Sequence, residues 1–248
     1  MTTSDSTTSR VALVTGGSGG IGRAVCERLA ADGVAIGVAY AGNKDTAQQT
    51  VDAVRAAGGR AIILVGDVAD ETAMSTVFDE LETAFGGVDI VVNTAGQMIL
   101  GPVVTFDLDA LDRMHRTNIR GTFVVAQQAA RRVRPGGSII TFSTTVTRLA
   151  NPNYAAYAAS KGAVEAVTLI LARELKGRDI TVNAVAPGPT ATPLFLNGKD
   201  QATIDHIAGL NPTGRLGTPA DIAETVAFLA GPGRWVNGQV LFANGGAA

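Results

Sequence analysis

The sequence contains a single cysteine, Cys26, and two histidines, His115 and His206. One cysteine excludes an intrachain disulfide and is typical of a protein from a reducing compartment, so we expect a cytoplasmic location. Two histidines far apart in the chain do not provide a histidine-rich metal site, and we expect no bound metal.

A large excess of charge of either sign is also absent. The formal net charge is -2 at pH 7, and without a basic cluster neither nucleic acid nor an anionic membrane surface is expected as the main partner. No apolar run is long enough, and free enough of charge and glycine, to span a bilayer. These absences favour a small molecule as the partner of a soluble protein.

The length and composition indicate one folded unit. The 248 residues, 46% of them hydrophobic, can bury a large core, and α/β folds of this length commonly form a single domain. Residues 1–9 are polar and lack the basic start and apolar run of a secretory signal, so we predict a disordered tail there. Residues 10–248 are predicted to form one domain.

Short apolar runs alternate with segments of helical pattern along the chain. Apolar runs of this kind are typical of strands buried on both faces, and the alternation predicts a doubly wound parallel sheet of about seven strands with right-handed crossovers. The segment 194–210 is predicted to be irregular or helical. We expect strands over 11–14, 34–39, 61–65, 88–92, 138–142, 179–185 and 239–243, and helices over 23–31, 44–57, 70–85, 107–132, 218–230 and through Tyr157 to about 176.

The first predicted strand is followed by Gly17-x-Gly19-x-x-Gly22, which matches the fingerprint of dinucleotide-binding folds. Such glycines let a pyrophosphate approach the backbone, and the amides at the start of the next helix face its negative charge. A Walker-type loop is rejected, because Arg23 and Ala24 stand where it needs a lysine and a hydroxyl residue. The pattern therefore predicts a Rossmann-like α/β fold.

The second strand ends at Tyr40, and Asn43 and Lys44 follow shortly after. An acidic residue here would bind the adenosine ribose and favour NAD. Because none is present, a 2′-phosphate would not be repelled, and Asn43 and Lys44 could bind it. We expect NADP(H) as the cofactor, with NAD(H) possible. The alternative is that Lys44 is merely a solvated residue at a helix start.

Tyr157 and Lys161 stand four residues apart in an alanine-rich segment without proline, so a helix would place both on one face. A free tyrosine has a pKa near ~10. At roughly 4 Å and an effective dielectric of ~20, the ammonium would favour the phenolate by up to ~4 kcal/mol, which brings the pKa within range of acid-base catalysis. A surface tyrosine above a solvated lysine is the alternative that this pair alone leaves open.

Several spaced motifs follow one another in a characteristic order. They are Thr15-Gly16-x-x-x-Gly20-Ile21-Gly22, Asp67-Val68, Asn93-Thr94-Ala95-Gly96, Asn118, Tyr157 with Lys161, and Pro187-Gly188 with Thr192. In these motifs the chain resembles the short-chain dehydrogenase/reductase family, in particular its 3-oxoacyl reductase-like and glucose dehydrogenase-like branch. The resemblance extends from Arg10 to Gly246.

The resemblance implies two sets of site residues. The catalytic set is Asn118, Thr144, Tyr157 and Lys161. The residues expected to contact the cofactor are Gly16, Ser18, Gly20, Ile21, Gly22, Tyr40, Asn43, Lys44, Asp67, Val68, Asn93, Ala95, Gly96, Tyr157, Lys161, Pro187, Gly188 and Thr192.

Four positions depart from the family pattern, one of them Asn244 near the last glycines, where the family commonly has an aspartate. The catalytic serine position, thirteen residues before Tyr157, is Thr144, and Ser143 precedes it. Threonine keeps a hydroxyl that can bind a substrate oxygen, and we favour Thr144 over Ser143. Gly19 stands where many NADP-preferring relatives have a basic residue, which weakens the NADP prediction. Thr94 replaces an asparagine, with little expected effect.

The resemblance implies an NADP(H)-dependent oxidoreductase that transfers hydride between a nicotinamide and a ketone or secondary alcohol. Tyr157 would be the general acid or base, and Thr144 would bind the substrate oxygen. Lys161 would bind the nicotinamide ribose, and Asn118 would order a water or bend its helix by bonding to backbone. The alternatives are a catalytically silent dinucleotide-binding sensor or scaffold, and an NAD-dependent sugar or alcohol dehydrogenase.

Two further expectations follow from the resemblance. The helical regions around 107–132 and 153–176 form subunit contacts in relatives, so we expect a homotetramer. The segment after Thr192 corresponds to a lid over the substrate. An apolar substrate wall is expected from Leu194, Phe195 and Leu196, with Gln97, Met98 and Ile99 facing it.

Overall fold

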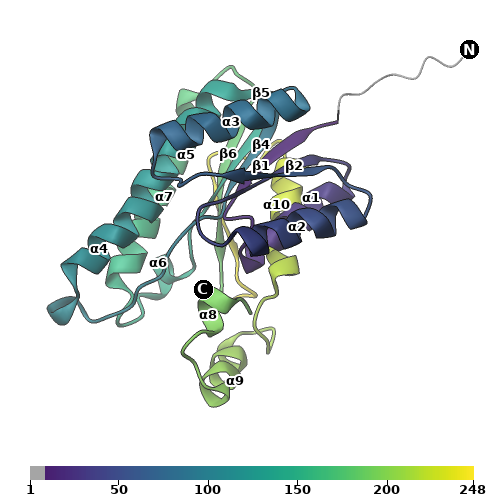
Figure 1. Cartoon of the computed structure of the whole chain (residues 1–248). Helices are drawn as coiled ribbons and strands as arrows, with labels where there is room; N and C mark the ends of the chain where they lie inside the picture. Colours follow the sequence, from purple (N-terminus) through teal and green to yellow (C-terminus); the bar gives the residue numbers. More distant parts are fainter. Residues whose placement is uncertain (1–8) are drawn as a thin grey trace, which may run out of the picture.

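The computed structural model describes residues 9–248 (Figure 1). A seven-stranded sheet lies at its centre, with strand order β3-β2-β1-β4-β5-β6-β7 and every neighbouring pair parallel. This confirms the predicted doubly wound α/β fold. The strands are β1 (Val11–Thr15), β2 (Ala35–Tyr40), β3 (Ala61–Val65), β4 (Val88–Asn93), β5 (Val133–Phe142), β6 (Thr181–Pro187) and β7 (Val240–Ala243). Of the predicted tail, residues 1–8 lie outside the described part of the chain.

Helices cover both faces of the sheet (Figure 1). One face packs against α1 (Gly20–Ala31), α2 (Lys44–Ala56) and α10 (Pro219–Ala230). The other packs against α3 (Glu71–Phe85), α5 (Gly121–Arg132) and α7 (Ala155–Glu174). The shorter elements are the 3-10 turn η1 (Val103–Thr105), α4 (Leu108–His115), the π turn η2 (Arg116–Arg120), α6 (Val146–Leu149), α8 (Pro193–Leu196) and α9 (Gln201–Leu210).

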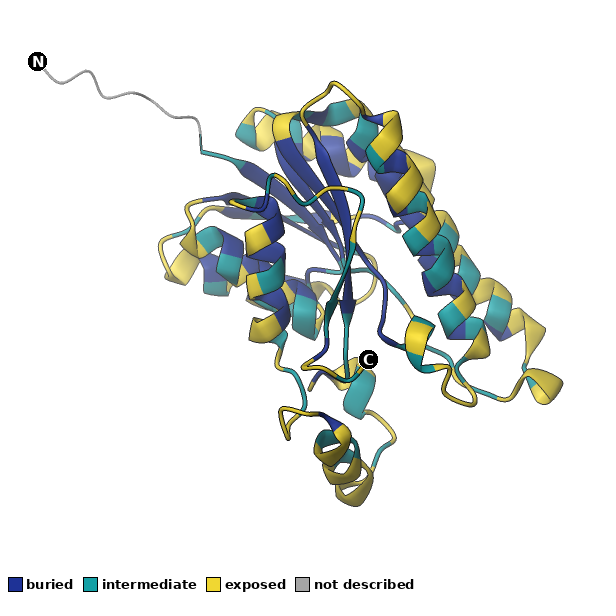
Figure 2. Cartoon of the chain, turned by 180° about the vertical axis from the view of Figure 1, so that it is seen from behind, coloured by how far each residue is buried: buried dark blue, intermediate teal, exposed yellow. Residues whose placement is uncertain are grey.

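The central strands of the sheet are buried on both faces, as Figure 2 shows by their dark colour, whereas the edge strand β7 is of intermediate burial. Successive side chains of a strand point to opposite faces. In β1, Val14 therefore belongs to the core under α1 and α10, and Leu13 to the core under α3 and α5. Both side chains are fully buried, which explains why the strands read as unbroken apolar runs rather than as alternating patterns.

Two elements differ from the sequence-based expectation. The helix expected over 107–132 consists of α4 and α5, joined by the π turn η2. A π turn inserts an extra residue into the helical ladder and occurs often at functional sites. The strand expected over 138–142 begins earlier, because Val133 pairs with Val88 across a register irregularity.

Residues 190–217 form a segment that contains α8 and α9 and projects beyond the sheet (Figure 1). A parallel bridge between Thr190 and Gly217 joins its two ends, and the Ala191 amide donates to the Gly217 carbonyl over 2.8 Å. The segment therefore leaves the body of the fold and returns to it at one place. The prediction of an irregular or helical segment here is refined to two helices.

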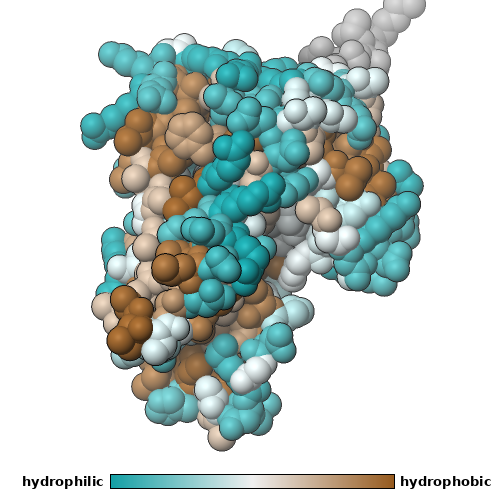
Figure 3. Space-filling model, turned by 60° about the vertical axis from the view of Figure 1, so that its left-hand side comes forward, coloured by the Kyte–Doolittle hydropathy of each residue, from teal (hydrophilic) through white to brown (hydrophobic). Residues whose placement is uncertain are grey.

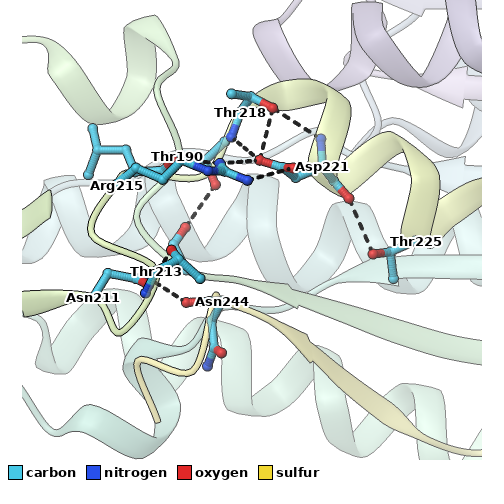
Figure 4. Close-up of polar contacts among 10 residues, drawn as sticks. Thr190, Asn211, Thr213, Arg215, Thr218, Asp221, Thr225 and Asn244 are labelled. Carbon is cyan, nitrogen blue, oxygen red and sulfur yellow. Dashed lines mark hydrogen bonds and ion pairs between the residues drawn. The ribbon is translucent and has the colours of Figure 1, made fainter.

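Polar contacts fix the base of this segment (Figure 4). Asn211, which follows α9, donates from Nδ2 to the Asn244 carbonyl over 2.8 Å. Arg215 pairs with Asp221 of α10 over 2.6 Å. Thr218 and Asp221 form a reciprocal capping box at the start of α10. The α8–α9 segment is thus anchored both to the strand end after β7 and to α10.

Within residues 9–248, α7 is the one helix long and apolar enough to cross a membrane by length and composition. In the structure it packs against β5 and β6. Its buried face includes Tyr157, Ser160 and Lys161. The helix thus packs on the sheet by one face, and its other face leaves Leu169 and Ile170 exposed.

Lys161 is a buried cation in this helix. Its side chain is 5% exposed, and Nζ donates to the Phe142 carbonyl at the end of β5 over 2.8 Å. Burial lowers the pKa of Lys161 to about 8, because one neutral carbonyl does not replace the hydration of an ammonium. The folded state therefore carries a penalty for this charge at neutral pH.

Replacing Lys161 by methionine (K161M) should stabilise the folded protein at pH 7 by roughly 1–3 kcal/mol, because it removes the buried charge. The folded-state pKa of about 8 lies below the ordinary value of 10.5. The loss of folding stability caused by the buried charge is therefore complete below pH 8. It disappears as the pH rises through 10.5, above which Lys161 is neutral in both the folded and the unfolded state. Urea unfolding at pH 7 and near pH 10.5 should show a gain for K161M that shrinks at the higher pH.

The matched control is K176M, since Lys176 is exposed just after the same helix. K176M should leave the free energy of unfolding within about 0.5 kcal/mol of wild type at either pH. A K161M protein less stable than wild type at pH 7 would show that Lys161 contributes net stability, contrary to this prediction.

Candidate active site

The glycine loop joins β1 to α1 through close backbone contacts. Gly16 has a φ of +65°, and a Cβ at Gly22 would lie 2.2 Å from the Gly16 carbonyl oxygen. Gly19 caps α1 without a side chain, and the first turn holds no acidic residue. The first amides of α1 are therefore available to an anion, and the cradle fits a pyrophosphate that must approach the backbone closely.

Two other loops reach the glycine loop. The Thr94 hydroxyl, after β4, donates to the Thr15 carbonyl over 2.6 Å, and a Cβ at Gly16 would lie 2.9 Å from that hydroxyl. Thr192, the N-cap of α8, places its methyl group 3.1 Å from the position of a Cβ at Gly20. Thr94 therefore braces the loop, a contact that sequence reasoning missed because its target is a backbone carbonyl.

Asn93 supports the loop from beneath. Its side chain is 3% exposed; Oδ1 accepts from the Thr15 hydroxyl over 2.6 Å, and Nδ2 donates to the Thr122 hydroxyl over 3.0 Å. The Asn93 side chain is thus used inside the fold between β1 and α5. The Asn93 side chain therefore has a supporting role, and a cofactor contact of this residue stays a prediction, as it does for Ala95 and Gly96, which continue the same loop at the sheet edge.

The predicted phosphate-binding residues lie between β2 and α2. The side-chain oxygen of Asn43, Oδ1, accepts from the backbone amides of Asp45 (2.9 Å) and Thr46 (3.2 Å), so Asn43 is the N-cap of α2. The Asn43 side-chain amide and the exposed Lys44 remain to meet a phosphate. Tyr40 is half-buried at the end of β2.

Asp67 and Val68, which are expected to contact the cofactor, follow β3. The Asp67 carboxylate accepts from the Ala69 amide over 2.9 Å and pairs with Arg116 over 2.5 Å. Burial acts to raise the pKa of Asp67, but these two donors outweigh it and leave that pKa below its usual value. Val68 is buried, and a Cβ at Gly121 would meet it at 2.6 Å.

On α7, Tyr157 and Lys161 occupy one buried face, as the spacing predicts. The Lys161 ammonium lies 5.9 Å from the centre of the Tyr157 ring. Both residues are almost fully buried, which rules out the alternative of a surface tyrosine above a solvated lysine.

The predicted lowering of the Tyr157 pKa is wrong for the protein's own groups. Burial raises the pKa of Tyr157 to about 12, and a hydrogen bond with Thr144 offsets only part of that rise. The reason is that Lys161 donates to the Phe142 carbonyl and its own charge is disfavoured by burial. A tyrosine in this environment keeps its proton at neutral pH and is a proton donor.

The π turn η2 brings Asn118 into the interior, where it is fully buried. Its Oδ1 accepts from the Gln97 amide over 2.8 Å, while Nδ2 donates to the Gln97 carbonyl and the Ser160 hydroxyl, each over 2.9 Å. The backbone-bonding role that the sequence left open is therefore present. A Cβ at Gly96 would lie 3.4 Å from both Asn118 Oδ1 and Lys161 Nζ. Water binding by Asn118 stays a prediction.

The structure distinguishes the two candidate hydroxyls after β5. Ser143 donates to Glu165 on α7 over 2.5 Å. The Thr144 hydroxyl lies close enough to the Tyr157 phenol to lower its pKa. The geometry therefore favours Thr144, because the proton of the Ser143 hydroxyl is already directed to a carboxylate.

A cavity of about 380 Å³ opens beside Tyr157 and Thr144. Among the described residues, Lys161 is the one charged side chain that lines it. Leu194, Phe195, Gln97 and Met98 contribute as predicted, whereas Leu196 and Ile99 do not. Distant segments that sequence reasoning missed add Val146, Leu149, Tyr154, Ile207 and Leu210.

Pro187 and Gly188 end β6 at the edge of this cavity. The Gly188 amide donates to the Ala243 carbonyl over 3.0 Å, and a Cβ at Gly188 would meet Asn244 at 2.8 Å. Ile21, at the start of α1, lines the same cavity. The glycine loop, the β6 end and the tyrosine helix therefore converge at the carboxyl edge of the sheet, where open α/β sheets bind ligands.

Comparison with known proteins agrees with this geometry. Residues 16–248 match a family model described as enoyl-(acyl carrier protein) reductase. A short-chain type dehydrogenase/reductase of Picea abies is 41% identical over 248 residues, which cover 96% of this chain and 92% of the relative. The chloroplastic NADPH-dependent aldehyde reductase 2 of Arabidopsis thaliana is 40% identical, with 96% and 93% covered.

Solved structures show the same fold. The angucycline C-6 ketoreductase LanV, a structure with bound NADP, superposes with a TM-score of 0.90 at 35% identity, covering 96% of this chain and 95% of that one. Sequence and structure agree over nearly the full length of each relative. This chain belongs to the short-chain dehydrogenase/reductase family.

Proposed function

We propose that this protein is an NADPH-dependent reductase of neutral, apolar ketones. The observation that carries the proposal is that the buried side chains of Tyr157 and Thr144 line the same, mostly apolar cavity. The NADPH-dependent aldehyde reductase of Arabidopsis thaliana and the NADP-bound ketoreductase support the cofactor and the reaction type.

The residues of the chain fit a nicotinamide dinucleotide. The glycine cradle between Gly16 and Gly22 and the free amides of α1 would hold the pyrophosphate. Lys44 and the Asn43 amide would bind the 2′-phosphate, and Lys161 would bind the nicotinamide ribose. When bound, the cofactor supplies the hydride, and the protein supplies orientation and electrostatics.

The proton chemistry belongs to Tyr157 and its neighbours. Thr144 donates a hydrogen bond that holds the substrate carbonyl oxygen, and Tyr157 gives its phenolic proton to that oxygen as negative charge develops there. With its pKa raised by burial, Tyr157 carries the proton that this step needs at neutral pH. Asn118 is proposed to hold a water near Lys161 through which Tyr157 is reprotonated.

The cavity supports the substrate class. Its one charged lining residue among those described is Lys161, which we place on the nicotinamide ribose. No further charged side chain is then left to pair with a phosphate or carboxylate in the substrate. Apolar side chains from three separate segments, such as Met98, Leu149 and Phe195, instead favour a hydrophobic ketone. This lining argues against a sugar dehydrogenase, and the complete Tyr157 site argues against a silent sensor.

Tyr157→Phe should lower kcat for ketone reduction by about 10²–10⁴-fold, the usual contribution of a general acid. The dissociation constant for NADPH, followed by its fluorescence, should stay unchanged. Tyr154→Phe is the matched comparison, because Tyr154 lines the same cavity, and it should cost less than about 10-fold. Wild-type turnover by Tyr157→Phe would refute the assignment, and NADPH binding without consumption over a ketone panel would indicate the silent sensor.

Thr144→Ala should lower kcat by about 10²-fold, since it removes a donor to the developing oxyanion. Thr144→Ser keeps the hydroxyl and should recover most of the activity. Steady-state kinetics with one ketone measure kcat for both variants. An equal loss of kcat in the two would show that the Thr144 hydroxyl does not contribute to catalysis.

The protein is further proposed to be a cytoplasmic homotetramer without nucleic-acid or membrane partners. Figure 3 shows hydrophobic side chains on the face that carries α4, α5 and α7. Phe123 on α5 is 59% exposed, and Ile170 on α7 is 57% exposed. Exposed apolar residues on adjacent helices support burial against another copy of the chain, as the family resemblance implies.

Light scattering should give about four times the chain mass of 25.3 kDa. The pair Phe123→Asp and Ile170→Asp should give a smaller species, because charges on the shared face oppose burial. Val65→Asp is the control, since Val65 is exposed at the end of β3, on the far edge of the sheet. A monomeric wild-type protein would end the tetramer proposal.

A further inference from the structure

Glu165 lies on α7 at the same helical spacing that relates Tyr157 to Lys161. Residues 157, 161 and 165 are each four apart and therefore share one face of the helix. One carboxylate oxygen of Glu165, Oε1, accepts from the Ser143 hydroxyl over 2.5 Å and from the Thr147 hydroxyl over 3.0 Å. Glu165 thus has a defined place in the site, although it does not line the cavity.

The two hydroxyls that Glu165 binds stand on either side of Thr144. Ser143 directly precedes Thr144, and Thr147 follows it by three residues. Thr147 also reaches the Thr144 carbonyl, from its hydroxyl over 2.9 Å and from its amide over 3.3 Å. One carboxylate oxygen therefore holds the turn that carries Thr144 at both of its ends.

The backbone of this turn is attached to a different element. The Ser143 amide donates to the Val185 carbonyl over 2.8 Å, and the Thr145 amide donates to the Pro187 carbonyl over 2.9 Å. Both acceptors belong to β6. These bonds place the turn relative to the sheet, whereas Glu165 links it to α7, the helix that presents Tyr157.

We propose that Glu165 is a positioning residue that sets the Thr144 hydroxyl relative to the Tyr157 phenol. The inference rests on the proposed function, in which both hydroxyls bind one substrate oxygen. A charged acceptor makes shorter and stronger hydrogen bonds than a neutral one. Because Glu165 accepts the hydrogen bond of the Ser143 hydroxyl, Thr144 is left as the hydroxyl that can donate to the substrate.

Glu165→Ala should lower kcat by about 10- to 100-fold, because a displacement of the order of 1 Å is enough to cost that much. The KM for the ketone and the dissociation constant for NADPH should change much less, since the cavity and the glycine loop remain. Glu165→Gln keeps an acceptor oxygen and should recover part of kcat. The matched control is Glu174→Gln at the exposed end of α7, which should leave kcat unchanged.

A double-mutant cycle separates positioning from a general structural effect. Once Thr144→Ala has removed the hydroxyl, adding Glu165→Ala should lower kcat by less than about 2-fold. The same 10- to 100-fold loss in both backgrounds would overturn the proposal, and so would an unchanged kcat in Glu165→Ala. If Glu165→Ala does not fold, the pair Ser143→Ala and Thr147→Val removes both donors and should reproduce the kcat loss.

The cycle is run on a ketone that the wild-type protein reduces. Absence of wild-type turnover over the whole panel refutes the proposed function itself. A turnover that depends on Tyr157 and Thr144 but not on Glu165 refutes the positioning role alone.

Discussion

The contact between the Lys161 ammonium and the Phe142 carbonyl is the constraint on which the site depends. It joins α7 to the end of β5 through a buried charge, and a buried charge with few partners is destabilising. The surrounding structure offsets this cost by packing α7 against β5 and β6. Tyr157 and the turn with Thr144 then take their positions from the same helix and the same strand end.

The parallel sheet brings the other segments of the site together at one edge. Because the strands run in one direction, the loops after β1, β4, β5 and β6 all emerge at one edge. Contacts between these loops are close: Thr94 braces the glycine loop, and Thr192 packs on Gly20. The α8–α9 segment, whose two ends are joined by the bridge between Thr190 and Gly217, adds apolar side chains to the cavity at this edge. A site for a dinucleotide and a carbonyl or alcohol substrate is therefore built from segments far apart in the chain.

Much of this arrangement was predictable because its signals are local. The apolar runs predicted the sheet, the glycines predicted the loop before α1, and the spacing of Tyr157 and Lys161 predicted their shared helical face. Other features depend on what surrounds a side chain. The sequence suggested a lowered Tyr157 pKa, whereas burial raises that pKa. The Asn43 side chain caps α2, and the Asn93 side chain bonds β1 to α5.

The sequence by itself therefore determined the order of strands and helices, the glycine cradle and the residues able to donate a proton, because periodicity and backbone freedom are properties of neighbouring residues. The tertiary structure decided that Thr144 rather than Ser143 faces Tyr157. It also decided that Glu165 accepts hydrogen bonds from Ser143 and Thr147, on either side of Thr144, and that the cavity is mostly apolar. These outcomes depend on burial and on hydrogen-bond partners that come together only when β5, α7 and the α8–α9 segment pack around one edge of the sheet.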